Sequence, residues 1–199
     1  MELLLIRHAL PVRIENQSGR ADPDLSELGH AQAEAVATWL GAEEVDAIYV
    51  SPLARARQTA LPIEAVLGLE SIVDDDLAEW DRDAREYIPM EELKATGHET
   101  WAAMAGRRWD DLGIDIDAFR ARVTASIDGI VERHGGERVA VVCHGGVINT
   151  CTGTVLGIPD PLFFEPDYTS ISRVVGSQAG HRSIRSINET AHLRELRSS

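Results

Sequence analysis

The sequence predicts an α/β fold: a three-layer sandwich whose central, mostly parallel sheet has helices on both faces. Apolar runs at residues 3–6, 45–50 and 138–143 have the length and composition of strands buried on both faces. Segments with the apolar spacing of helices separate these runs, and such alternation is typical of parallel sheets. The chain has 199 residues, and we expect one domain over residues 1–199.

The first half of the chain supplies two strand and helix pairs. After the strand at 3–6, Ser26 is placed to cap a helix that Gly41 ends. After the strand at 45–50, Ser51 is the expected N-cap of a helix that runs from residue 52 to about 67. Proline cannot donate the backbone hydrogen bond, so Pro62 is expected to kink or split that helix.

Periodicity weakens between residues 71 and 113, which we interpret as an insertion or cap over a site. Its large aromatic residues could line a substrate pocket or pack the insertion itself: Trp80, Tyr87, Trp101 and Trp109. A helical stripe then runs from Phe119 to Val131. The strand at 138–143 follows, then a helix that ends near Leu156, and two later strands at 170–175 and 182–187.

Composition excludes several classes of function. Lys and Arg total 19 against 33 Asp and Glu, and the net charge of −14 would repel nucleic acid and anionic membranes. No apolar run approaches the roughly 20 residues that a membrane span needs. The only cysteines are Cys143 and Cys151, and no leader precedes the first strand, so we expect a cytoplasmic protein without disulfides.

Ligands of parallel sheets bind beyond the carboxyl ends of the strands, and three loops follow such ends. They hold Arg7-His8, the segment from Ser51 to Arg55, and His144-Gly145-Gly146. Two arginines could clamp one phosphate, and backbone N–H groups at Gly145 and a helix N-terminus could approach it. No cysteine stands with these histidines as in a zinc site, and we expect neither metal nor cofactor.

A histidine held beside a clamped phosphate could attack phosphorus, because neutral imidazole is nucleophilic near pH 7. The leaving oxygen then needs a proton, which a carboxylic acid with a raised pKa could supply. The acidic stretch between Asp74 and Glu86 is the place where we expect this acid.

Five motifs follow one another in order along the chain. They are Leu5-Ile6-Arg7-His8-Ala9, Asp24 to Ala33, Ser51 to Ala60, Leu77-Ala78-Glu79 and Val142 to Ile148, and Asn188 with His192-Leu193 forms a weaker ending. Each resembles the corresponding motif of the histidine phosphatase superfamily, which also includes the cofactor-dependent phosphoglycerate mutases. The resemblance spans residues 3 to 193.

The resemblance implies a phosphoglycerate mutase-like fold and a role for each matching residue. His8 would be the nucleophile that becomes phosphorylated, Arg7 and Arg55 phosphate clamps, His144 a phosphate contact, and Glu79 the proton donor. Arg57 would point elsewhere on its helix.

The chain departs from the family in its first loop. Ala9 stands where Gly is usual, which the turn tolerates if φ at this residue is negative, and Leu10-Pro11 replaces polar residues. The Asn with which the mutases hold substrate is out of register, and Asn16 could compensate. These changes affect the identity of the substrate more than phosphoryl transfer.

The predicted function is metal-independent hydrolysis of small-molecule phosphate monoesters through a phosphohistidine. The alternatives are a phosphoglycerate mutase-type phosphotransferase, a phospho-ligand binding protein of low turnover on the same fold, and a phosphatase of phosphohistidine proteins. The sequence leaves the oligomeric state open, with a homodimer as one option.

Overall fold

The computed structural model describes residues 1–15 and 18–196, which form a sheet of six strands in the order β3-β2-β4-β1-β5-β6. The strands are β1 (Glu2–Arg7), β2 (Ala47–Val50), β3 (Ser71–Val73), β4 (Arg138–Cys143), β5 (Ile171–Gly176) and β6 (Arg182–Glu189). The helices are α1 (Glu27–Leu40), α2 (Ala54–Leu67), α3 (Met90–Thr96), α4 (Glu99–Ala105), α5 (Ile116–Arg133) and α6 (Gly145–Leu156). Short 3-10 turns are η1 (Asp75–Leu77), η2 (Trp109–Leu112) and η3 (Ala191–Leu193).

The sheet is mostly parallel, as predicted. Strands β1, β4, β2 and β3 pair in parallel, and β5 pairs antiparallel with both β1 and β6. Among the described strands, β5 alone therefore runs against the others. The carboxyl ends of β1, β2 and β4 consequently open at the same edge, where the sequence motifs lie.

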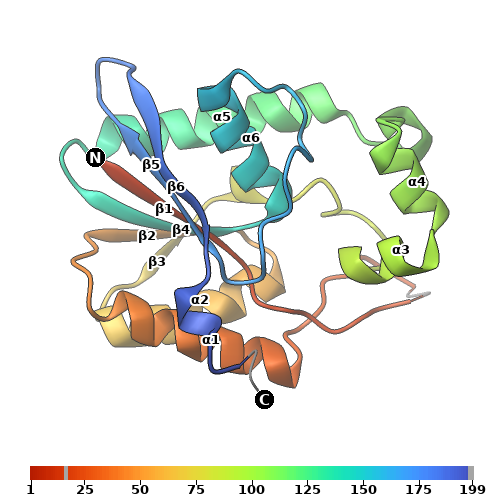
Figure 1. Ribbon diagram of the computed structural model, residues 1–199, viewed down its shortest axis with the longest axis horizontal. Coiled ribbons are helices and arrows are strands. Elements are labelled where there is room, and N and C mark those ends of the chain that lie inside the picture. Colours follow the sequence, from red (N-terminus) through yellow and green to blue (C-terminus); the bar gives the residue numbers. More distant parts are fainter. Residues whose placement is uncertain (16–17, 197–199) are drawn as a thin grey trace.

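Helices cover both faces of the sheet, and β1 shows how the sequence determines this arrangement (Figure 1). Leu3 and Leu5 point to one face and pack in the core formed with α5 and α6. Leu4 and Ile6 point to the other face and pack with α1 and α2. Side chains of a strand alternate between faces, so a continuous apolar run is needed where both faces are covered.

The start of α1 is fixed by its cap, as predicted. The Ser26 hydroxyl accepts the backbone N–H of Gly29 and donates to the carbonyl of Leu10, in the loop that follows the first strand. A Cβ at Gly29 would collide with this carbonyl of Leu10. The glycine of this motif therefore lets α1 approach the loop that begins at His8.

The structure corrects the predicted N-cap of α2 and rules out a split of this helix at its proline. The N-cap is Leu53 and not Ser51, whose hydroxyl contacts His144 instead. The helix is not split at Pro62 but runs unbroken from residue 54 to 67. Its buried residues Ala60 and Ile63 flank the proline and pack against the sheet, and such packing outweighs the loss of one backbone hydrogen bond.

The segment predicted as an insertion begins in the sheet, because Ser71–Val73 forms the edge strand β3. The rest leaves the sheet, and α3 and α4 lie beyond the carboxyl ends of the strands (Figure 1). Backbone hydrogen bonds in both directions between Ile14 and Tyr87 attach this segment to the loop after β1. No helix in the described ranges is long and apolar enough to cross a membrane.

Candidate active site

The two predicted histidines meet because β1 and β4 are neighbours in the sheet. Arg7 pairs with Cys143 at the last step of the ladder, and the backbone N–H of His8 donates to the carbonyl of Cys143 over 2.8 Å. The residues that follow each strand are His8 and His144. Their ring centroids lie 5.0 Å apart.

The His8 ring is held in one tautomer. Its Nδ1 lies 2.8 Å from the carbonyl oxygen of Ala9, which can only accept, so Nδ1 carries the proton and Nε2 keeps its lone pair. Burial lowers the pKa of His8 well below its ordinary value, and the charges of Arg55 and Arg7 add to this effect. His8 is therefore neutral at pH 7, as a nucleophile must be. Ala9 is absent from the described residues with positive φ, so the turn tolerates its side chain, as predicted.

His144 is completely buried behind His8, and its Nε2 lies 2.7 Å from the hydroxyl of Ser51 at the end of β2. Its Nδ1 has no hydrogen-bond partner in the described part of the protein. Burial lowers the pKa of His144 well below the usual range, and Arg55 lowers it further. The ring is thus neutral, and one of its buried nitrogens has no protein partner among the described residues.

Two buried arginines stand beside the histidines. Arg7 is 8% exposed, donates to the carbonyl of Pro166, and has its guanidinium carbon 3.9 Å from the centre of the Tyr168 ring. Arg55 is 1% exposed and donates to Asp81 over 2.8 Å. The Nε atoms of both arginines are buried and have no hydrogen-bond partner within residues 1–15 and 18–196. Buried cations with unsatisfied donors suit an anionic ligand.

Thr59, one helical turn after Arg55, connects the two sides of the site. Its hydroxyl donates to the carbonyl of Arg55 over 2.7 Å and accepts the backbone N–H of Ala9 over 2.9 Å. This threonine therefore ties the loop of His8 to the first turn of α2. Arg57, two residues after Arg55, is exposed and does not line the pocket, as expected.

Glu79 is the carboxyl group that the structure places at the site. One of its oxygens accepts the backbone N–H of Gly146 over 2.8 Å, and the other accepts that of Trp80. Burial raises the pKa of Glu79 to about 7, and the negative charge of Asp81 adds to this effect. A carboxyl group with this pKa can be protonated near neutral pH and can donate a proton.

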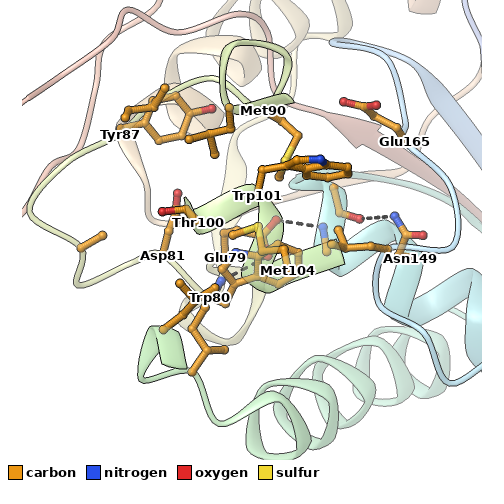
Figure 2. A pocket seen from close by; sticks show the side chains of 18 of the residues that line it. Glu79, Trp80, Asp81, Tyr87, Met90, Thr100, Trp101, Met104, Asn149 and Glu165 are labelled. Carbon is orange, nitrogen blue, oxygen red and sulfur yellow. Dashed lines mark hydrogen bonds between the residues drawn. The ribbon is translucent and has the colours of Figure 1, made fainter. Parts of the chain in front are cut away.

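A cavity of about 610 Å³ lies over these groups (Figure 2). Of the predicted site residues, the following line it: Arg7, His8, Arg55, Glu79 and Gly145. His144 lies behind this wall, and Asn16 lies outside the described residues. No three His, Cys, Asp or Glu side chains within residues 1–15 and 18–196 are grouped so that they could hold a metal ion.

The aromatic residues of the insertion have both of the roles considered. Trp80, Tyr87 and Trp101 line the cavity. Trp109 is buried and packs on Trp80, with ring centroids 5.4 Å apart.

Sequence reasoning missed four residues that contact the candidate site residues. Ser51 and Thr59 belong to the recognised motif, but their roles depend on contacts across the sheet. Tyr168, under the guanidinium of Arg7, follows a long loop and belongs to none of the recognised motifs. Asp81 is one of several carboxylates in the acidic stretch that contains Glu79, and nothing in the sequence distinguishes it from the others. Its contact with Arg55 joins residues that are far apart in sequence.

Comparison with known proteins identifies the family of this chain. The family model of the histidine phosphatase superfamily (branch 1) matches residues 3–190. Phosphoserine phosphatase 1 of Hydrogenobacter thermophilus is 31% identical over 98% of this chain and 96% of its own length. A metal-independent phosphoserine phosphatase of Arabidopsis thaliana is 33% identical over 74% of this chain and 65% of its own.

Solved structures show the same fold. The phosphoserine phosphatase of Entamoeba histolytica, in complex with 3-phosphoglyceric acid, superposes with a TM-score of 0.75 at 25% identity, over 96% of this chain and 98% of that chain. The chain therefore belongs to the histidine phosphatase superfamily, and it is a phosphoric monoester hydrolase that works through a phosphohistidine.

Proposed function

We propose that His8 is the nucleophile, that Arg7, Arg55, His144 and the backbone at Gly145 hold the phosphoryl group, and that Glu79 is the general acid. The observation on which this assignment depends is the free Nε2 of a neutral His8 between two buried arginines with unsatisfied donors. The substrate in this proposal is a small-molecule phosphate ester. Its hydrolysis needs neither metal nor cofactor.

In the first half of the reaction, Nε2 of His8 attacks phosphorus and the bond to the ester oxygen breaks. Glu79 transfers its proton to that oxygen, so the product leaves as an alcohol. Arg7 and Arg55 hold the phosphoryl oxygens, on which negative charge is spread in the transition state. The carbonyl of Ala9 keeps the proton on Nδ1 and stabilises the positive ring that forms.

In the second half, water enters the place of the alcohol. The Glu79 carboxylate takes a proton from this water, whose oxygen attacks the phosphorus of the phosphohistidine. The phosphorus–nitrogen bond breaks, inorganic phosphate is released, and His8 and Glu79 return to their starting states. The unpartnered Nδ1 of His144 is a donor for a phosphoryl oxygen if the Ser51 hydroxyl donates to Nε2.

The segment from residue 79 to 114 favours a small substrate. We propose that this segment is a cap on a single domain. Its residues form most of the cavity wall that does not belong to the sheet. A volume of about 610 Å³ is typical of sites for small molecules. The homodimer and the cytoplasmic location stay predictions, and so does the contact of Asn16 with substrate.

Phosphate release from 4-nitrophenyl phosphate in excess chelator tests this proposal. We expect wild-type activity to survive and His8→Ala to lose at least roughly a thousandfold, as expected for loss of a nucleophile. Mass spectrometry of the rapidly quenched wild-type reaction should find the phosphoryl group on His8.

His30→Ala is the matched control, because His30 is exposed on α1. The control should keep wild-type activity. Activity that disappears with the chelator, or that persists in His8→Ala, would contradict the assignment.

A further inference from the structure

The cavity has two chemically different parts. The floor holds the charged groups that act on phosphate, at Arg7, His8, Arg55 and Glu79. The remaining wall comes largely from the cap and from the loop after α6. It presents Tyr87, Met90, Trp101, Met104, Leu162 and Phe164. Met90, Trp101 and Met104 line the same cavity as Glu79 (Figure 2), and we expect the alcohol half of a substrate to lie there.

The charges of this wall oppose a second anionic group. Away from the clamp arginines, Lys94 is the one Lys or Arg among the described residues that line the cavity, against the carboxylates of Asp83, Glu86 and Glu165. Lys94 is already engaged, because it is ion-paired with Glu165 and lies 4.7 Å from the centre of the Trp101 ring. A substrate carboxylate would have to share Lys94 with Glu165, whose negative charge opposes its binding.

We infer that the alcohol half of the substrate is an uncharged, largely apolar group of the size of an aromatic ring. Phosphate esters with a carboxylate beside the ester, such as phosphoserine and 3-phosphoglycerate, are poor substrates of this chain. The inference rests on the proposed function, since it takes the site at His8 as the place where phosphate binds. It concerns the chemical class of the leaving alcohol, which the catalytic residues do not determine.

The physical reason is that contact with this wall favours binding of an apolar group and opposes binding of a negatively charged one. An aromatic ring that leaves water for the wall lined by Trp101 and the two methionines gains by burial and by ring and sulfur contacts. A carboxylate in this cavity loses part of its hydration and is repelled by Asp83, Glu86 and Glu165, which line the same cavity. Lys94 is the one lysine among the described residues of the wall, and it already contacts Glu165 and Trp101. It therefore compensates little of the free energy that a substrate carboxylate loses on entering the cavity.

The test compares alkyl phosphates, so that the chemistry of the leaving oxygen stays similar. Values of kcat/KM are measured for 2-phenylethyl phosphate, ethyl phosphate, O-phospho-L-serine and 3-phosphoglycerate in excess chelator. We expect 2-phenylethyl phosphate to exceed ethyl phosphate and both carboxylates by about tenfold or more, from burial of the ring. Equal or better turnover of either carboxylate would overturn the inference.

Two variants locate the effect in the wall. Trp101→Ala should lower the ratio of kcat/KM for 2-phenylethyl phosphate to that for ethyl phosphate by about tenfold. Trp39→Ala, a partly exposed tryptophan on α1 outside the cavity, is the matched control and should leave the ratio at its wild-type value. Glu165→Gln releases Lys94 and should raise kcat/KM for phosphoserine several-fold.

The outcomes separate the two proposals. Good turnover of phosphoserine with loss of activity in His8→Ala would overturn the inference and leave the proposed function standing. An unchanged ratio in Trp101→Ala would also overturn the inference. Wild-type enzyme that hydrolyses neither these esters nor 4-nitrophenyl phosphate would contradict both.

Discussion

At the scale of single residues, the chemistry depends on how burial sets protonation. Burial holds the pKa of both His8 and His144 below the ordinary value of 6.5 and raises the pKa of Glu79 to about 7. The proposed nucleophile, His8, is thus neutral and the proposed acid, Glu79, is protonated over the same interval of pH. Two groups with opposite requirements become ready together because both lose water.

The pH dependence follows from these directions. In free enzyme Glu79 must be protonated, so kcat/KM for ethyl phosphate should fall as pH rises through about 7. On the acid side of the pH profile, kcat/KM should fall only below pH 6.5, where His8 gains a proton, because the pKa of His8 is lowered. Glu79→Gln should reduce kcat/KM for ethyl phosphate roughly 10²–10⁴-fold, as for a general acid.

Nitrophenolate leaves without a proton, so 4-nitrophenyl phosphate tests the role of the acid. In Glu79→Gln its phosphorylation step, measured as a burst of nitrophenol, should change far less than the turnover of ethyl phosphate. Asp83→Asn is the matched control, since Asp83 is an exposed carboxylate that lines the same cavity. Equal losses for both substrates in Glu79→Gln would show that Glu79 acts only by supporting the site.

At the scale of elements, the glycine pair that opens α6 connects the helix to the acid. The backbone N–H of Gly146 donates to Glu79, and a Cβ at this position would collide with Glu79 and with the ring of Trp80. Gly145 has space, because the nearest atom to its Cβ would be Cδ of Pro166 at 4.0 Å. Of these two adjacent glycines, only Gly146 therefore lacks the space for a larger side chain.

Substitution of each glycine by alanine should therefore change the stability of the protein by different amounts. Gly146→Ala should lower the free energy of unfolding by roughly 1–3 kcal/mol, as expected for overpacking, and should reduce activity because Glu79 is displaced. Gly145→Ala should leave stability unchanged or slightly raised, because alanine favours a helix. Urea unfolding followed by tryptophan fluorescence measures both, and equal stability of the two variants would contradict the explanation.

The same scale shows what a sequence can and cannot predict. The runs at Leu3–Ile6 and Val139–Cys143 were predicted as strands because both of their faces are buried. Strand β3 was missed because Ser71–Val73 is short and half exposed at the edge of the sheet. The motifs named the residues that the structure brings to one cavity, whereas contacts such as that of Ser51 with His144 depend on which strands become neighbours.

At the scale of the whole molecule, a network of charges around Arg173 connects segments that are distant in sequence. Arg173 on β5 is ion-paired with Glu43 after α1 and with Glu189 at the end of β6. Its hydrogen bonds to Glu43 lower the pKa of that carboxyl below its ordinary value of 4.5. This arginine therefore helps to join the sheet to the helical layer.

Removal of this arginine should destabilise the fold without affecting the site. Arg173→Gln should lower the free energy of unfolding by roughly 1.5–3 kcal/mol at pH 7, the range for hydrogen bonds to charged groups. Because the pKa of Glu43 is lowered, the stabilisation is present above pH 4.5 and is lost as pH falls through the lowered value. The difference from wild type should therefore shrink at acid pH.

Urea unfolding at pH 7 and near pH 4 measures this change. Arg108→Gln is the control, because Arg108 and its partner Asp111 are both more than half exposed, at 56% and 57%. Exposed pairs contribute little, so the control should differ from wild type by less than about 1 kcal/mol. A difference for Arg173→Gln that does not depend on pH would contradict the role given to Glu43.

The position of β1 between β4 and β5 has a consequence for the order of folding. Both neighbours come much later in the chain, at residues 138–143 and 171–176. During synthesis on the ribosome, the strand that ends at the nucleophile therefore stays without its partners for on the order of ten seconds or more at typical elongation rates. Its apolar residues are exposed to chaperones and to aggregation throughout this interval.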